Sequence, residues 1–427
     1  MIDDSGDVDQ IQGIHAPRDP DRVATSPSED DLDYASPAYL DMIDRSLLSS
    51  GNNVRLKQAI EKAKRGEHVT IAFIGGSITH GAGATPIHLQ NYAYHTYEHF
   101  KKMFTPLNSN AIQLIKAGVG GTPSELGVIR YERDVLRDGS VKPDIVIVEF
   151  AVNDADDETR GNCYESLVLK ALASDNDPAV ILLFSVFKND WNLQDRLTPV
   201  GFHYDLPMVS MKDALVEQFQ KTKDEGRVIT KEQYFHDIYH PTNTGHRIMA
   251  DALANLFRVT DCSDLDQEVN ELKKLPIIGN DYMNVKLLDR KNAEQIAHIH
   301  TGNFCHTDTD LQMAEMDDHA NATALFPNNW MYIGDETAGD NGFKLHLRCS
   351  RLILIFKDSG DEIFGTAHIK VDGKMAKEAD PHQVNWTHCH VMILLSHEEV
   401  DEHVIEIDMA LGHEDKRFTI LGFGYVD

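Results

Sequence analysis

Cysteine, long apolar runs and positive charge are all scarce in this chain of 427 residues. The five cysteines are odd in number and widely spaced, which excludes a disulfide framework and a Cys-x-x-Cys metal site. No apolar run approaches the roughly 18–20 residues that a membrane-spanning helix needs. Lysine and arginine total 40 against 69 aspartates and glutamates, a net charge of −29. Such acidity disfavours nucleic acid and anionic membranes as partners.

The N-terminus shows no secretory leader, because Met1–Gln10 is acidic and contains no apolar stretch. We therefore expect a cytoplasmic protein with reduced thiols, or a secreted one if a leader has been removed. Residues 1–36 are rich in Asp, Ser and Pro and poor in aromatics. This composition predicts a flexible acidic arm.

Residues 37–262 are expected to form an α/β domain. Apolar runs of Val, Ile and Leu alternate here with amphipathic segments. The predicted strands are 69–74, 111–116, 145–150 and 179–187, and the predicted helices are 52–66, 91–104, 124–136, 165–173, 211–222 and 243–257. Continuous apolar strands between helices indicate a parallel sheet covered on both faces, which makes a three-layer α/β/α domain.

Residues 263–427 are expected to form a second domain of another class. The predicted strands, which are short and separated by turn residues, are 344–347, 352–356, 366–371, 387–395, 403–409 and 418–425. Asp372-Gly373, which follows the third of them, is a hairpin-type signal. The pattern predicts an antiparallel, jelly-roll-like β-sandwich.

Two glycine-containing blocks follow the first two predicted strands of the α/β domain, at the edge where ligands bind in open α/β sheets. Gly75-Gly76-Ser77 turns sharply after its strand, and the Ser77 hydroxyl is a candidate nucleophile. The second block contains Gly118, Gly120 and Gly121. Glycines there allow a backbone N–H to approach an oxyanion with no side chain between them.

Two further blocks contain polar side chains. Asn153 and Asp154 follow the third predicted strand, and the Asn153 amide can donate a hydrogen bond. Asp237-Ile238-Tyr239-His240 offers a carboxylate and an imidazole three residues apart. His240 is a candidate general base, and Asp237 would fix its tautomer and stabilise the imidazolium.

The four blocks, taken together and in this order, resemble those of the GDSL/SGNH hydrolase family over roughly residues 53–260. The first block is similar to the family's Gly-Asp-Ser-Leu string, with Gly76 in place of Asp and Ile78 in place of Leu. The third is similar to Gly-x-Asn-Asp, with Ala151 where glycine is usual, and the fourth matches Asp-x-x-His. These departures preserve every catalytic residue type.

The resemblance implies a role for each residue. The implied catalytic triad is Ser77, Asp237 and His240, and the implied oxyanion hole consists of Ser77, Gly121 and Asn153. Gly120 is the nearest competitor of Gly121. The implied chemistry is acyl transfer, in which Ser77 attacks an ester carbonyl while His240 takes its proton. We expect no cofactor and no metal to be needed.

A family hydrolase domain followed by a β-sandwich is similar to carbohydrate esterases, in which the sandwich is carbohydrate-binding-module-like. The resemblance implies a serine esterase that removes O-acetyl groups from xylan- or mannan-type polysaccharides or oligosaccharides. Two alternatives stay open: a general short-chain esterase, lipase or thioesterase on other esters, and a non-catalytic carbohydrate-binding protein. The polysaccharide, the acetyl position and the oligomeric state are undetermined, and a homo-oligomer is allowed.

Several aromatic and histidine side chains are candidates outside the four blocks. Trp191, His203 and Tyr204 lie in a long segment between a predicted strand and a helix, where they could bind substrate or anchor the loop. Trp330, Tyr332 and Trp386 are candidates for sugar contact or for the core of the β-rich half. His388-Cys389-His390 places two imidazoles on one face of a predicted strand, which resembles part of a metal site but has no further ligand at a convincing spacing.

Overall fold

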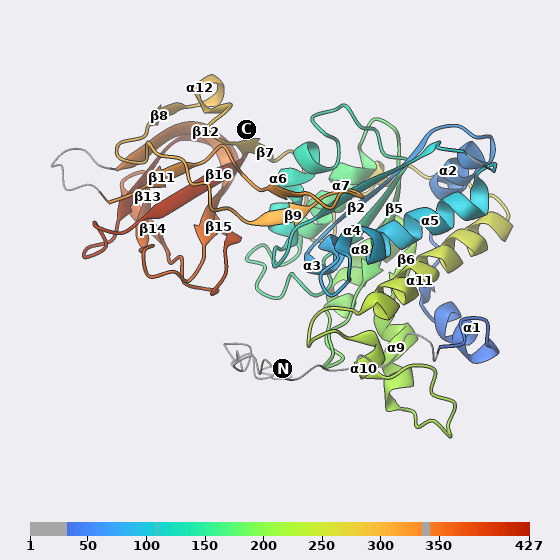
Figure 1. Cartoon of the computed structure of the whole chain (residues 1–427). Coiled ribbons are helices and arrows are strands. Elements are labelled where there is room, and N and C mark those ends of the chain that lie inside the picture. Colours follow the sequence, from blue (N-terminus) through green and yellow to red (C-terminus); the bar gives the residue numbers. More distant parts are fainter. Residues whose placement is uncertain (1–31, 108, 335–341) are drawn as a thin grey trace, which may run out of the picture.

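The computed structural model describes residues 32–107, 109–334 and 342–427. Most of the expected N-terminal arm, residues 1–31, lies outside these ranges. The described chain forms an α/β domain followed by a β-rich domain at its side (Figure 1). An α/β sheet with helices and a C-terminal antiparallel sheet confirm the fold class that the sequence indicated. No described helix has the length and apolar character that crossing a membrane requires.

The α/β domain is built on a six-stranded sheet in the order β1-β6-β5-β4-β2-β3. Its strands are β1 (Leu47–Ser49), β2 (Val69–Gly75), β3 (Ile112–Gly118), β4 (Ile145–Glu149), β5 (Ala179–Phe184) and β6 (Met208–Ser210). All neighbours pair in parallel except β1, which runs antiparallel to β6 at the edge. The sequence analysis missed β1 and β6, because three residues are too few to show a period.

Helices cover both faces of this sheet (Figure 1). They are α1 (Pro37–Asp44), α2 (Val54–Lys64), α3 (Ser77–His80), α4 (Ile87–Gln90), α5 (Tyr92–Phe104), α6 (Ser124–Asp134), α7 (Asn162–Leu172), α8 (Gln194–Tyr204), α9 (Met211–Gln220), α10 (Lys231–Tyr234) and α11 (Asn243–Cys262). Ile71 and Phe73 of β2 belong to a core with α2, α5 and α11, whereas Ala72 and Ile74 belong to a core with α6 and α7. The alternation of side chains along β2 therefore supplies both layers.

The β-rich domain is an eight-stranded antiparallel sheet in the order β11-β16-β12-β15-β13-β14, with β7 on β16 and β8 on β12. Its strands are β7 (Lys286–Leu288), β8 (His298–His300), β11 (Trp330–Tyr332), β12 (Phe343–Asp358), β13 (Ala367–Val371), β14 (Lys374–Ala379), β15 (His388–Met409) and β16 (Phe418–Val426). The minor elements before and between them are η2 (Glu271–Lys273), α12 (Ala293–Ile296), β9 (Met313–Glu315) and β10 (Ala322–Ala324).

Two of these strands are much longer than the sequence indicated. β12 joins the predicted strands 344–347 and 352–356, and β15 joins 387–395 and 403–409. The pairing register of β12 with β15 shifts between Cys349 and Arg351 and again between Leu352 and Ile353. A bulge of this kind interrupts the alternation of buried and exposed residues, so in a sequence it resembles a turn.

The two domains share one hydrophobic core. Ile129 of α6 lies in the same cluster as Ile355 of β12, Cys389 of β15 and Leu421 of β16. The connecting segment that contains β9 and β10 also crosses to the α/β domain, where the Asp317 carboxylate accepts a hydrogen bond of 2.9 Å from the Lys116 backbone N–H. The β-rich domain is therefore packed on the α/β domain rather than tethered to it.

Candidate active site

Ser77 is the first residue of α3, directly after the central strand β2. Its helix packs on the end of β3 at Gly118, where an added Cβ would lie 2.0 Å from the His80 backbone nitrogen. Only glycine allows two backbone segments to approach this closely. The hydroxyl of Ser77 is thereby held at the carboxyl edge of the sheet, and the residue is partly exposed.

The sequence-predicted triad residues are joined by hydrogen bonds. His240 Nε2 lies 3.0 Å from the Ser77 hydroxyl oxygen, and His240 Nδ1 lies 2.8 Å from Asp237 Oδ2. Both residues belong to the loop between α10 and α11, and the fold brings His240 to Ser77 across 163 positions of the chain. A hydroxyl, an imidazole and a carboxylate in this order can activate a nucleophile.

The Asp237 carboxylate is held in its ionised form. Partial burial would raise its pKa, but the hydrogen bond and charge of His240 and the backbone N–H groups of Tyr239 and His240 lower that pKa to about 2. Asp237 Oδ1 accepts both N–H groups at 2.7 Å, while Oδ2 faces the ring. One oxygen thus shapes the loop, and the other keeps the Nδ1 proton on His240.

Asn153 lies beside the backbone that leads into Ser77. A Cβ added to Gly76 would come 2.3 Å from the Asn153 side-chain oxygen, so the amide occupies the space that glycine leaves. Within the described part of the chain, no hydrogen bond holds this side chain. Its amide is therefore available to donate to a group bound next to Ser77.

Gly120 and Gly121 form a turn on the other side of Ser77. A Cβ on Gly120 would lie 3.9 Å from the Ser77 Cβ, and Gly121 has φ +70°, a conformation that favours glycine. Among the described residues, neither backbone N–H has an acceptor. The backbone N–H groups of Gly120 and Gly121 are therefore both candidates to donate a hydrogen bond to an oxyanion at Ser77.

The β-rich domain fixes the peptide planes of this turn. The Gln312 amide donates to the Gly120 carbonyl at 2.8 Å, and His388 Nε2 lies 3.0 Å from the Gly121 carbonyl oxygen. Since C=O and N–H point in opposite directions across a trans peptide, holding the Gly120 carbonyl directs the Gly121 N–H the other way. Nothing in the local sequence pattern marks Gln312 for this role, because its position depends on how the domains pack.

Trp386 of the β-rich domain borders the same turn. A Cβ on Gly121 would lie 2.9 Å from two atoms of its ring, and 42% of the residue is exposed. Trp330 and Tyr332, by contrast, are 2% and 3% exposed within the core of the β-rich domain. Of these three aromatic residues, Trp386 is therefore the one that can meet a ligand at the Ser77 site.

The other aromatic candidates divide into two groups. The Trp191 ring stacks on Phe187 at 5.7 Å, and Phe187 contacts Tyr239, the neighbour of His240. Tyr204 is buried and donates to Glu165 at 2.7 Å, and His203 Nε2 lies 2.9 Å from the Leu275 carbonyl oxygen. His203 and Tyr204 thus anchor the segment between the domains, and the structure does not bring them to Ser77.

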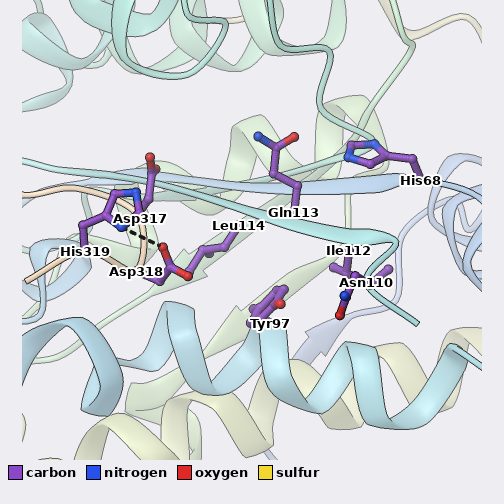
Figure 2. Close-up of a pocket in the computed structure, with 9 residues that line it drawn as sticks. All are labelled: His68, Tyr97, Asn110, Ile112, Gln113, Leu114, Asp317, Asp318 and His319. Carbon is purple, nitrogen blue, oxygen red and sulfur yellow. Dashed lines mark ion pairs between the residues drawn. The ribbon is translucent and has the colours of Figure 1, made fainter. Parts of the chain in front are cut away.

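A separate hollow of about 480 Å³ lies at the free edge of β3 (Figure 2). It is lined by His68, Tyr97, Asn110, Ile112, Gln113, Leu114, Asp317, Asp318 and His319. None of the residues named above as candidates for the Ser77 site lines it. We therefore do not assign it to the chemistry of the triad.

Comparison with known proteins agrees with this geometry. Residues 73–248 match the model of the GDSL-like Lipase/Acylhydrolase family. The chain is similar to the crystal structure of a two-domain esterase (CEX) active on acetylated mannans, at 27% identity and a TM-score of 0.76 over 90% of this chain and 99% of that chain. The chain is also similar to the two-domain esterase (CEX) co-crystallized with mannopentaose, at 26% identity and a TM-score of 0.75 over 90% of this chain and 98% of that chain. A search of the curated proteins finds no match.

The family match includes the Ser77, glycine, Asn153 and Asp237–His240 blocks, and the structural similarity extends over both domains. This chain therefore carries a GDSL-like lipase/acylhydrolase domain and has the two-domain architecture of an esterase.

Proposed function

We propose that this chain is a serine esterase that removes O-acetyl groups from mannan- or xylan-type polysaccharides or their oligosaccharides. The observation that carries the proposal is the continuous hydrogen-bond chain from Asp237 through His240 to Ser77. Two backbone glycines and the Asn153 amide flank the hydroxyl, where negative charge develops in acyl transfer. This arrangement supports a nucleophile, a base and oxyanion donors within one site.

The proposed mechanism has two steps. The Ser77 oxygen attacks the acetyl carbonyl carbon while His240 Nε2 takes the hydroxyl proton, and the N–H groups of Ser77 and Gly121 and the Asn153 amide stabilise the oxyanion. His240 then protonates the departing sugar oxygen, which leaves an acetyl-enzyme. Water attacks this ester, His240 accepts its proton, and acetate leaves when the proton returns to Ser77.

The substrate class is supported by two observations. The esterase that this chain resembles over both domains is active on acetylated mannans and was crystallized with mannopentaose. In this chain the exposed ring of Trp386 stands next to Gly121, where a sugar attached to the acetyl group would lie. A flat aromatic ring suits the apolar face of a sugar. We therefore place mannan-type acetyl esters first and xylan-type esters second.

The test is acetate release from acetylated manno- and xylo-oligosaccharides. We expect release by the wild type and none above background with Ser77→Ala. The exposed Ser140→Ala variant should retain wild-type rates, because Ser140 lies in a distant turn. Absence of release from any sugar ester by the folded wild type would contradict the proposal.

Acyl length separates this proposal from a general esterase or lipase. Aryl esters of increasing chain length should be hydrolysed with a steep fall from acetate to butyrate. Equal or rising rates would favour a general acyl hydrolase. Binding of mannopentaose without turnover of any ester would instead favour a carbohydrate-binding protein.

A further inference from the structure

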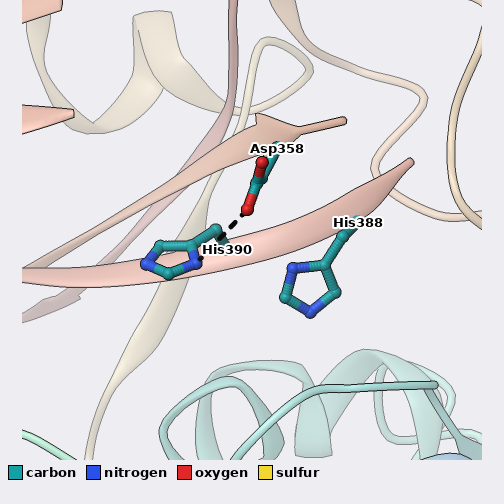
Figure 3. A group of neighbouring side chains, drawn as sticks. All are labelled: Asp358, His388 and His390. Atoms are coloured by element: carbon teal, nitrogen blue, oxygen red, sulfur yellow. Dashed lines mark ion pairs between the residues drawn. The ribbon is translucent and has the colours of Figure 1, made fainter. Parts of the chain in front are cut away.

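Asp358, His388 and His390 come together on one face of the β-rich domain (Figure 3). His388 and His390 alternate on β15, and Asp358 on β12 is the direct cross-strand partner of His388. One nitrogen or oxygen atom from each of the three lies within 4.8 Å of the others. The third ligand that the sequence around His388 did not offer is thus Asp358, which lies on the neighbouring strand 30 residues earlier in the chain.

Two polar atoms in this group are buried and have no partner in the described structure. Asp358 is 0% exposed and His388 is 6% exposed, and neither Asp358 Oδ1 nor His388 Nδ1 has a hydrogen-bond partner. Burial without a partner costs free energy for each atom. This observation is independent of the clustering itself, and a ligand bound between the two atoms would satisfy both.

The tautomer of His388 follows from its other contact. Its Nε2 faces the Gly121 carbonyl oxygen at 3.0 Å, and a carbonyl can only accept, so Nε2 carries the proton. In the neutral ring Nδ1 then presents a lone pair. Figure 3 shows that this ring nitrogen faces Asp358 and His390, while the other points away from them. A lone pair and a carboxylate facing each other attract a cation.

We propose that Asp358, His388 and His390 bind a divalent transition-metal ion, with Zn²⁺ as the first candidate. Two imidazoles and one carboxylate form a ligand set that suits Zn²⁺ better than Ca²⁺ or Mg²⁺, which take mainly oxygen. Metal–ligand bonds of about 2.0–2.2 Å require the three ligand atoms to close on the ion by small side-chain rotations. His390 is partly exposed, which leaves an entry path and a position for water.

The ion would act on the active site through His388. Metal at Nδ1 keeps the proton on Nε2, and so it holds the hydrogen bond to the Gly121 carbonyl. His388 is then a positioning residue for the turn at Gly120 and Gly121. Asp358 and His390 act on this turn only through the ion and His388. This consequence rests on the proposed function, whereas metal binding does not.

The binding test uses the full-length chain without a polyhistidine tag. After treatment with chelator, the wild type is titrated with Zn²⁺ by calorimetry and its metal content is measured by mass spectrometry. We expect one tight equivalent, which Asp358→Asn and His390→Ala weaken by at least about tenfold, since loss of even an outer-shell partner costs 10–100-fold. His368→Ala is the control, because His368 lies on β13 beside Glu378 and is outside the Asp358–His388–His390 cluster.

Equal Zn²⁺ binding by the wild type and both variants, or no stoichiometric binding by the wild type, would overturn the proposal. A second measurement needs no variant. Anomalous diffraction from Zn²⁺-soaked wild-type crystals should give a peak between Asp358, His388 and His390. A peak only at His240 and Asp237, or none, would likewise overturn it. Esterase activity is measured separately with Ser77→Ala as the blank, so failure of the proposed function is distinguishable from failure of the metal site.

Discussion

The Asn153 side chain fills the space above Gly76, the residue that precedes Ser77. We predict that Asn153→Ala lowers turnover about 100- to 1,000-fold, since one oxyanion donor contributes about 3–4 kcal/mol to the barrier. The variant should fold normally, because no hydrogen bond holds this side chain within the described residues. Turnover on an aryl acetate and the melting temperature measure the two effects. The exposed Asn284→Ala is the control, and a near-normal rate for Asn153→Ala would remove the amide from the site.

Glu149 ends β4 behind Ser77 and is fully buried. Burial raises the pKa of its carboxyl from 4.5 to about 7, although a hydrogen bond from Thr79 opposes the shift. Since the folded state holds this proton more tightly than the unfolded state, the stability contribution is complete below pH 4.5 and is lost as the pH rises through about 7.

We predict that Glu149→Gln removes this loss of stability. Between pH 4.5 and about 7, the free energy of unfolding of the wild type should fall by about 3 kcal/mol relative to that of Glu149→Gln. Urea denaturation across the pH range measures the difference. Parallel curves for the two proteins would show that folding does not raise the pKa of Glu149.

At the residue scale, the sequence was most informative in its short local blocks. Ser77, Asn153, Asp237 and His240 were identified from their blocks, and the structure places them together. Gln312 and Trp386 reach the same site from the β-rich domain. The sequence offered Trp386 only as one of three aromatic candidates and gave no sign of Gln312, because their positions arise from packing between segments that are far apart in the chain.

At the scale of elements, the position of α3 depends on contact with β3 through Gly118. A methyl group there would overlap backbone atoms of Thr79 and His80, which cannot move aside as a flexible side chain can. We predict that Gly118→Ala displaces α3 and Ser77, lowers stability by a few kcal/mol and abolishes most activity. Gly139→Ala is the control for backbone strain without steric overlap: Gly139 has φ +86° and nothing lies within 4 Å of its added Cβ, so this variant should lose only about 1–2 kcal/mol and keep its activity. Thermal denaturation and aryl acetate turnover should separate the two variants clearly.

The longer elements were predicted more reliably than the short ones. Strands such as β2 and helices such as α11 carry continuous apolar runs or a clear helical period, so their existence could be read directly from the sequence. α8 was missed because Pro199 lies inside it, and β12 and β15 were each divided because bulges break their alternation. In these cases tertiary pairing overrides the local signal.

At the scale of the whole molecule, the shared core decides how the domains behave. Ile129 of α6 packs directly on Gly424 of β16, and the β-rich domain contributes several buried residues to the same cluster. Each large apolar side chain buried there contributes about 1.5–3 kcal/mol, and a domain is typically stable by only about 5–15 kcal/mol. Separating the domains would therefore remove a large part of the stability of the α/β domain.

We predict that the full chain unfolds in one cooperative transition and that a chain ending at residue 262 does not fold stably. Calorimetry of the full chain and circular dichroism of the truncated one test this. The matching control is Trp386→Ala, which leaves the shared core intact and should reduce activity on acetylated oligosaccharide more than on aryl acetate. A truncated chain with the full-length melting temperature would show that the domains are independent.

The sequence alone was enough for the two domain classes and the parallel sheet, and its short blocks predicted Ser77, Asp237 and His240 as a triad, because periodicity and short blocks act over a few neighbouring residues. The glycine turn held by Gln312 and His388, the Trp386 ring beside it and the Asp358–His388–His390 cluster required the folded chain. Each of these depends on strand pairing or domain packing across tens to hundreds of residues. Such contacts follow from the burial of a common core, which no local pattern records.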